Sequence, residues 1–266
     1  MPSFFDKLQD VLAQTTAIPP AQIQETIAKA QATMGANPVA AVKLLLMAQA
    51  TEPKNPQIFL ALGDVYSNEN QSEEAIKAYE SAVKFMPDKP EAFLALGTEL
   101  LTGEKFELAE AFLMHGLLLS EPKETIDLYN LALAFYQQER PAEAIPFCHQ
   151  ALENGKDHDS ETLLGDCLYD LERYEEAADA YTRSLASEPE SAYDAERLGF
   201  TLERLERYQE SIDTLQQALT NGSDEPDIYA SLSRCYDQVG QKELSEETAK
   251  KYYELSPTPT EEAAAE

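Results

Sequence analysis

The chain has 266 residues, of which 43% are hydrophobic, and its 10 Gly and 15 Pro fit a folded protein rather than wholesale disorder. Its 49 Asp and Glu residues against 20 Lys and Arg residues leave a formal net charge of −29. Such a charge repels nucleic acids and anionic membranes, so neither is expected as a partner.

The charge is unevenly distributed along the chain. Residues 1–55 carry 4 acidic and 4 basic side chains, whereas the net charge is −8 for residues 56–124, −11 for 125–191 and −10 for 192–266. The whole acidic surplus therefore follows residue 55, and the sequence predicts two regions with different surfaces.

The sequence also bears on localisation. No stretch approaches 18 consecutive apolar residues, and the chain starts without a basic leader followed by an apolar core, so neither a membrane span nor a secretory signal is expected. Cys148, Cys167 and Cys235 lie far apart, and their odd number favours free thiols in a reducing compartment. We therefore expect a cytoplasmic protein.

The first predicted helix covers residues 3–15. Ser3 with Asp6 three residues later reads as a capping box, and an apolar stripe follows at helical spacing. The favoured interpretation is a cap over the end of the fold. The alternative is a docking helix that packs on a neighbouring molecule through Phe4, Phe5 and Leu8, which makes these residues candidates for self-association.

A repeat of about 34 residues fills most of the remaining chain. A Leu followed by a small residue recurs six times, at spacings of 34, 35, 33, 34 and 34 residues, and a second small residue follows each pair twelve positions later. The Leu-small pairs are Leu62-Gly63, Leu96-Gly97, Leu131-Ala132, Leu164-Gly165, Leu198-Gly199 and Leu232-Ser233.

Each repeat reads as a helix, a short break and a second helix. In the first repeat, apolar residues step at helical spacing on both sides of the polar run 68–71, and Pro87 closes the unit. A small residue at a helix crossing lets two backbones approach, so a bulky side chain at Gly63 or Ala75 is expected to overpack that crossing.

These residues resemble the signature of the tetratricopeptide repeat, a 34-residue helix–turn–helix unit that stacks into a superhelix. The resemblance implies an all-α, right-handed α-solenoid with an N-terminal capping helix. We expect a capping or docking helix and linker at 1–21, a degenerate repeat at 22–55, and a disordered acidic tail at 260–266. Six full repeats are expected at 56–89, 90–124, 125–157, 158–191, 192–225 and 226–259. The residues that carry the resemblance are Leu62, Gly63, Tyr66, Ala75, Tyr79, Ala82 and Pro87.

Two repeats depart from the pattern. The third lacks the closing Pro and has Cys148 where an aromatic residue is expected, and the sixth ends with Ala249 and Tyr252 in reversed sizes. The last helix is therefore expected to pack differently.

Catalytic and metal-binding motifs are not apparent. His115, His149 and His158 are the only histidines, and no two are spaced for metal binding on one helix. There is no Gly-rich phosphate loop, nucleophile elbow or Zn-type Cys pair. Neither an enzyme, a cofactor nor a metal is expected.

In the family that the chain resembles, the first helix of each repeat lines an inner groove. Carried over by position, the inner face is tyrosine-rich and apolar with acidic residues between, although the leucines fit an inter-repeat core equally well. The candidate groove residues are Leu94, Leu101, Tyr129, Leu133, Tyr136, Asp166, Tyr169, Tyr193, Arg197, Phe200, Arg204 and Arg234.

Arg197, Arg204 and Arg234 form a basic cluster on this predicted face. They could hold an acidic group of a ligand. The favoured interpretation is that they pair with nearby carboxylates, which is the usual arrangement of surface charges. The expected partners are Glu196, Glu203 and Asp237.

Two functions follow from this pattern. The leading hypothesis is an adaptor or chaperone-like module that binds an apolar protein segment carrying Lys or Arg, with apolar anchors giving affinity and the acidic rim giving steering. The alternative is a structural scaffold that self-associates, with the N-terminal helix of one molecule docked on the next.

Overall fold

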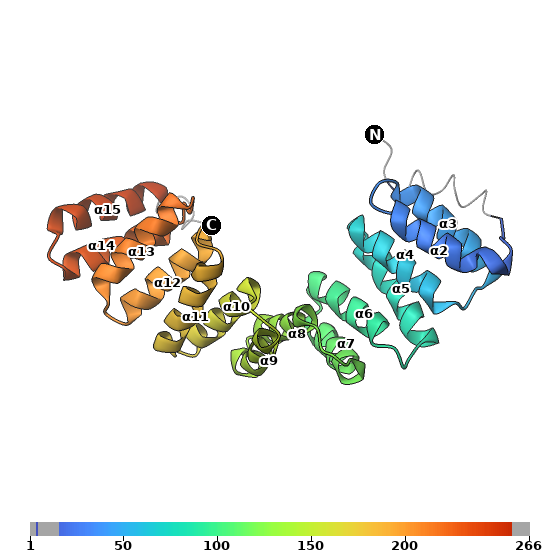
Figure 1. The fold of residues 1–266 in the computed structure, drawn as a ribbon. Coiled ribbons are helices and arrows are strands. Elements are labelled where there is room, and N and C mark those ends of the chain that lie inside the picture. Colours follow the sequence, from blue (N-terminus) through green and yellow to red (C-terminus); the bar gives the residue numbers. More distant parts are fainter. Residues whose placement is uncertain (1–3, 5–15, 257–266) are drawn as a thin grey trace, which may run out of the picture. The chain divides into compact units, whose positions relative to one another are not determined.

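The computed structural model describes residue 4 and residues 16–256 (Figure 1). This part of the chain holds a 3-10 turn, η1 (Pro20–Gln22), and fourteen α-helices, α2 to α15, packed pairwise. The all-helical expectation is therefore confirmed. The chain divides into two compact units, residues 1–123 and residues 124–266.

The first unit holds three helix pairs in its described residues. Within each pair the two helices are antiparallel neighbours, and each pair also contacts the next. The pairs are α2 (Ile23–Thr33) with α3 (Pro38–Thr51), α4 (Pro56–Asn68) with α5 (Ser72–Phe85), and α6 (Pro90–Thr102) with α7 (Phe106–Leu119).

In its described residues the second unit holds four pairs, and its consecutive first helices α8, α10, α12 and α14 contact one another. The pairs are α8 (Thr125–Gln137) with α9 (Pro141–Glu153), α10 (His158–Asp170) with α11 (Tyr174–Ser187), α12 (Ala192–Arg204) with α13 (Tyr208–Thr220), and α14 (Pro226–Gln238) with α15 (Lys242–Leu255).

Local sequence sets where the helices begin. Proline occupies the first turn of five of the α-helices, where its missing N–H costs no hydrogen bond. Four helices have a capping side chain that accepts a hydrogen bond from a backbone N–H of the first turn. The capping residues are Asn37, Asn55, Asp157 and Ser191.

The turn inside each full repeat has one backbone conformation. A residue with φ between 55° and 78° follows the first helix, and the next N–H returns to a carbonyl five residues earlier, as from Gln71 to Tyr66 at 2.8 Å. Only the last turn uses Gly for this left-handed position. The six residues are Asn70, Glu104, Glu139, Glu172, Glu206 and Gly240.

In four of the helix pairs, the crossing depends on a missing Cβ atom. A Cβ built on Gly63 would lie 2.3 Å from the Tyr79 ring, and one on Gly97 would lie 2.6 Å from Cγ of Leu113. Gly165 and Gly199 meet a large residue of the following helix in the same way. The large partner always lies sixteen residues after the glycine.

In the two full repeats without this glycine, both members of the crossing are small. Where the third repeat has Ala132, the residue sixteen positions later is the small, fully buried Cys148. Where the sixth has Ser233, the residue is Ala249, and the hydroxyls of Ser233 and Ser245 exchange hydrogen bonds with each other's backbone carbonyls, both at 2.9 Å. The departures seen in the sequence therefore change both members of each crossing, with a larger residue in place of the glycine and a smaller one in place of its partner.

The ends of the chain are only partly described. Phe4 packs edge-to-face on Tyr66 with ring centroids 6.2 Å apart. The other two self-association candidates, Phe5 and Leu8, and the tail 260–266 lie outside the described residues. None of the helices in the described part is both long enough and apolar enough to cross a bilayer.

Candidate functional site

The first helices of the second unit present most of the predicted groove residues on one face. Tyr193 is the most accessible of the aromatic residues there, with 49% of its surface exposed. The others are half-buried, apart from the exposed Arg204 and Arg234 and the buried Asp166. The residues are Tyr129, Leu133 and Tyr136 on α8, Asp166 and Tyr169 on α10, Tyr193, Arg197, Phe200 and Arg204 on α12, and Arg234 on α14.

Asp166 is the centre of a hydrogen-bond network beneath this face. Although predicted as an acid of the groove, it is only 6% exposed. Its Oδ1 accepts hydrogen bonds from the Tyr181 hydroxyl at 2.7 Å and from Nε of Arg197 at 3.0 Å. The Tyr193 hydroxyl reaches Oδ2 at 3.0 Å. One buried carboxylate therefore fixes two tyrosines and an arginine from two helices.

Aromatic packing completes this network. The guanidinium of Arg197 lies 4.5 Å from the centroid of the Tyr169 ring, within cation–π range. Tyr169 in turn meets Tyr174 edge-to-face at 5.4 Å. Because its hydroxyl is bound and its ring is half exposed, Tyr193 offers an aromatic surface that is already ordered.

Burial controls the ionisation of these groups. Desolvation raises the pKa of the Asp166 carboxyl, while its hydrogen bonds from Tyr181 and its ion pair with Arg197 act in the opposite direction. Burial, and then the nearby Asp166 carboxylate, raise the pKa of Tyr181 far above its ordinary value. Burial and the carboxylates of Asp166 and Asp170 likewise raise the pKa of Tyr136.

A matching pair lies in the first unit. The Tyr79 hydroxyl donates to Oδ1 of Asp64 at 3.0 Å, and burial followed by Asp64 raises the pKa of Tyr79. Asp64 and Tyr79 stand 102 positions before Asp166 and Tyr181, which corresponds to three repeats. The same Gly-Asp and Tyr pattern thus builds the same contact twice.

These raised tyrosine pKa values predict a loss of stability in alkali. Unfolded tyrosines ionise near pH 10, whereas Tyr79 and Tyr181 hold their protons in the fold, so the folded chain binds more protons above about pH 10 and stability falls as the pH rises. Phenolate absorbance and helical circular dichroism, followed together from pH 9 upward, should show the last tyrosines ionising only as the helices unfold. Complete ionisation of all 13 tyrosines in a fully helical protein would contradict this.

The arginine cluster is paired differently from the prediction. Arg234 binds Glu203 as expected, with Nε 2.5 Å from Oε1. Arg197 pairs with Asp166 and not with Glu196, because Asp166 projects from the neighbouring helix into the same buried network. Glu196 instead accepts a hydrogen bond from Ser223 at 3.0 Å.

Arg204 has a different environment. Its Nη2 and Nε donate to the Tyr174 hydroxyl at 2.9 and 3.2 Å, and no ion pair between Arg204 and a carboxylate occurs within residue 4 and residues 16–256. Tyr169, Phe200 and Arg234 join it around a hollow of about 420 Å³ between α10, α12 and α14. This hollow combines aromatic walls with an oriented guanidinium, and the carboxylates of Glu203 and Asp227 also line it.

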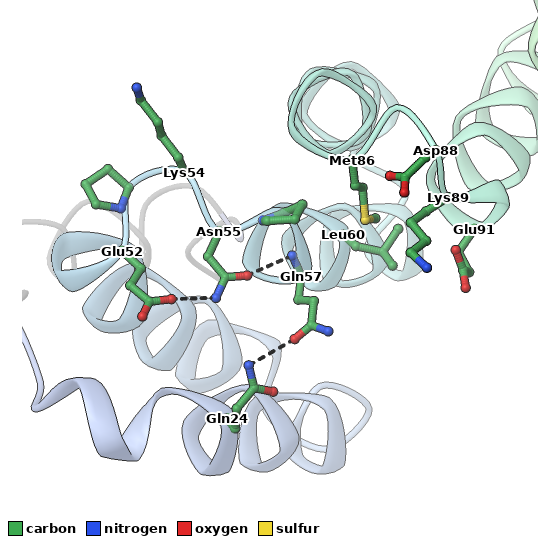
Figure 2. A pocket seen from close by; sticks show the side chains of 12 residues that line it. Gln24, Glu52, Lys54, Asn55, Gln57, Leu60, Met86, Asp88, Lys89 and Glu91 are labelled. Carbon is green, nitrogen blue, oxygen red and sulfur yellow. Dashed lines mark hydrogen bonds between the residues drawn. The ribbon is translucent and has the colours of Figure 1, made fainter.

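The first unit contains a larger hollow. It measures about 1070 Å³, and Leu60 and Met86 supply apolar surface within a polar rim that includes Lys54 and Lys89 (Figure 2). On one side, Nε2 of Gln24 donates to Oε1 of Gln57 at 3.0 Å. Both signs of charge line it, because Glu52, Asp88 and Glu91 complete the rim.

The other two predicted groove residues, Leu94 and Leu101, lie half-buried on α6 of the first unit. Leu94 packs over Gly116, where an added Cβ would lie 2.7 Å from its Cγ. Leu94 therefore contributes to the crossing of α6 and α7.

A second polar cluster, which the sequence did not reveal, lies in the interior of the second unit. The Ser184 hydroxyl contacts Nδ1 of His158 at 2.8 Å and Oδ2 of Asp194 at 2.9 Å, and Thr162 donates to the other Asp194 oxygen at 2.8 Å. These residue types also occur in hydrolytic sites, but Ser184 and Asp194 are completely buried and no substrate can reach them. The cluster instead ties α10, α11 and α12 together.

The three cysteines are buried free thiols, as expected of small core residues. No group of three or more His, Cys, Asp or Glu side chains in the described ranges could hold a metal ion.

The paired helices, their constant crossings and the tyrosine face define a stacked helix–turn–helix repeat protein. Family models agree: tetratricopeptide repeat models match residues 162–226 and 226–259, a TPR repeat model matches 63–98, and the model for subunit 3 of the anaphase-promoting complex, or cyclosome, matches 104–184. The chain is a tetratricopeptide repeat protein.

Solved structures with low sequence identity share this fold. YrrB, a TPR protein with an unusual peptide-binding site, is 19% identical, with a TM-score of 0.61, over 68% of this chain and 93% of its own. The pilF protein of Pseudomonas aeruginosa is 17% identical, with a TM-score of 0.63, over 79% of this chain and 95% of its own. MamA is 20% identical, with a TM-score of 0.59, over 62% and 91%. A search of curated proteins gives no match.

Tetratricopeptide repeat proteins mediate interactions with proteins and peptides and are typically scaffolds rather than enzymes.

Proposed function

We propose that this protein is an adaptor or chaperone-like module whose second unit binds an apolar protein segment carrying Lys or Arg. The observation that carries the proposal is the fixed aromatic face of α8, α10 and α12, on which Tyr193 keeps 49% of its surface exposed while Asp166 holds its hydroxyl. An ordered aromatic side chain loses little conformational entropy when a ligand packs on it. The solved structure of YrrB, a TPR protein with a peptide-binding site, offers a precedent for this use of the fold.

Charge selects the ligand class. The second unit is strongly acidic, with net charges of −11 for residues 125–191 and −10 for 192–266. Its first helices expose carboxylates beside the tyrosines, and these would attract Lys and Arg side chains flanking an apolar anchor. Arg204 would receive a carbonyl or carboxylate oxygen of the same segment. The exposed acids are Asp159, Asp170, Asp227 and Asp237.

Binding of synthetic peptides of three compositions tests the proposal. Fluorescence polarisation would compare a peptide of Leu, Phe and Lys with one in which Glu replaces Lys and one in which Ser replaces the apolar residues. The first should bind most tightly, and its affinity should fall as salt rises from about 0.05 to 0.5 M, because screening shortens the range of the acidic field.

The matched variants are Tyr136→Ala with Tyr169→Ala in one protein, and Tyr253→Ala in another. The first pair lies on the proposed face, whereas Tyr253 is an exposed tyrosine on α15. Loss of two aromatic anchors should weaken binding at least about tenfold, and the Tyr253 variant should bind normally. Equal binding by all three proteins, unchanged in high salt, would exclude this face as the site.

A further inference from the structure

The outer face of α7 differs from the outer faces of α5 and α13. Leu108, Met114 and Leu118 are 52%, 38% and 78% exposed, and Ala111 lies exposed between them. These four residues, the α7 patch, follow one another at helical spacing along the same side of the helix. The remaining side of α7 is occupied, because Ala109, Leu113, Gly116 and Leu117 are buried.

The repeat register shows that the α7 patch replaces polar surface. One repeat earlier, α5 has charged residues at all four positions, and the equivalent positions of α13 are all polar. A large exposed apolar surface where sister repeats carry charge marks an interaction site. The α5 residues are Glu74, Lys77, Glu80 and Lys84, and those of α13 are Glu210, Asp213, Gln216 and Thr220.

We propose that the α7 patch is a self-association surface on which a second copy of this chain docks, α7 against α7, in an antiparallel pair. The distribution of charge indicates that the partner is a second copy of the chain. Each copy has a net charge of −29, so two copies repel each other, yet residues 111–120 contain no charged side chain. The α7 patch therefore lets two copies meet with few carboxylates brought together, because Glu107 and the half-buried Glu110 are the carboxylates of this helix. A basic partner, by contrast, would find its complement on the acidic faces.

Symmetry sets the direction of the pair. With a two-fold axis beside residue 113, Leu108 of each copy faces Leu118 of the other, and the small Ala111 near the crossing lets the helices approach. The exposed Glu107 residues of the two copies would then stand about 18 Å apart along the helix axis, beyond the Debye length of roughly 8 Å at physiological salt. A parallel pair would place them side by side.

Sedimentation equilibrium of the full chain tests the proposal. One helix of 14 residues buries less than a standard interface, so we expect a weak dimer with a dissociation constant on the order of 10–100 µM. Higher salt should strengthen the dimer by screening the repulsion between copies, whereas it should weaken peptide binding by the second unit. A monomer at all accessible concentrations would overturn the proposal.

Leu108→Glu and Leu244→Glu form a matched pair of variants. Leu244 occupies the equivalent position on α15 and is 41% exposed, so both changes add the same charge at the same register. Leu108→Glu should raise the dissociation constant at least about tenfold, since each dimer carries the change twice, and Leu244→Glu should leave it unchanged. The opposite ranking would overturn the proposal.

A mixing experiment tests the antiparallel direction. Leu108→Glu and Leu118→Lys should each be monomeric alone, but an equimolar mixture should form a heterodimer, because the carboxylate introduced in one copy then faces the ammonium group introduced in the other. Failure of the mixture to associate would refute this pairing. If a dimer persists in both variants and disappears when residues 1–15 are removed, the N-terminal segment rather than the α7 patch is the self-association surface.

Discussion

Replacing Asp166 with Ala should lower the free energy of unfolding of the second unit by about 2–4 kcal/mol, a large effect for one side chain. The Tyr181 hydroxyl and Arg197 Nε would lose their shared acceptor while the surrounding helices still exclude water. Leaving a buried cation without a partner lowers stability more than removing an exposed acid does. The effect is reduced here because Arg197 keeps 19% of its side chain accessible to water. Urea unfolding followed by circular dichroism measures the change.

Asp159→Ala is the control for this prediction. Asp159 lies on the same helix, α10, but is exposed, so its loss should alter stability by less than about 0.5 kcal/mol. Asp166→Asn should fall between the two, because an amide oxygen still accepts a hydrogen bond but carries no charge. Equal stabilities of the Asp166→Ala and Asp159→Ala proteins would show that the network adds nothing to the fold.

Substitution of Asp166 also affects peptide binding. Asp166 fixes the hydroxyl of Tyr193, whose ring forms part of the proposed peptide surface. Without that acceptor the Tyr193 ring would sample more rotamers. The conformational entropy lost when the peptide orders the ring would then reduce peptide affinity. The affinity of the Leu, Phe and Lys peptide for the Asp166→Asn protein should therefore fall even where the helices remain intact.

The fold could be predicted from the sequence because its determinants are local and repeated six times. A Leu-small pair, a second small residue twelve positions later and a polar break place two helices and their crossing without any long-range information. The turns were less evident. Four of the six left-handed positions are Glu, so the usual Gly signal is missing there, and only the backbone shows that the same turn recurs.

The residue types of the site could be predicted from the sequence, but the hydrogen-bond network that joins them could not. The tyrosines of α8, α10 and α12 follow from repeat position, whereas Asp166 reads as one more acid in an acidic chain. Its burial depends on Tyr193 and Arg197, which approach from the next repeat. One signal was available: Asp64 and Tyr79 repeat the fifteen-residue spacing of Asp166 and Tyr181. An acid that recurs after the crossing glycine, with a tyrosine fifteen residues on, indicates a buried pair.

The α7 patch was also difficult to predict from the sequence alone. Its residues were visible in the sequence, but an apolar residue on a second helix reads equally as core, and only exposure separates the two. Comparison with the charged positions of α5 could have identified it, since the 34-residue register aligns Leu118 with Lys84. Positions that break a repeat's own pattern are therefore the ones to examine for function.

The crossing glycines allow a test of the packing rule that the repeats share. Gly97→Ala should destabilise the first unit by about 1–3 kcal/mol, although Ala is the better helix former, because its Cβ would lie 2.6 Å from Leu113 Cγ and 3.0 Å from Leu113 N. Gly35→Ala is the control, since an added Cβ there meets nothing within 4 Å, and it should change stability by less than about 0.5 kcal/mol.

Leu113→Cys alone should also destabilise the first unit, by about 2–3 kcal/mol, because it leaves a cavity in a fully buried position. The double variant Gly97→Ala with Leu113→Cys reproduces the Ala132 and Cys148 pair of the third repeat, so the added methyl group should occupy part of the space that the leucine leaves. Its loss of stability should be smaller than the sum of the single losses by about 0.5–3 kcal/mol in a double-mutant cycle of urea unfolding. Strictly additive losses would mean that the two positions do not share volume, and the pairing of Ala132 with Cys148 in the third repeat would then need a different cause.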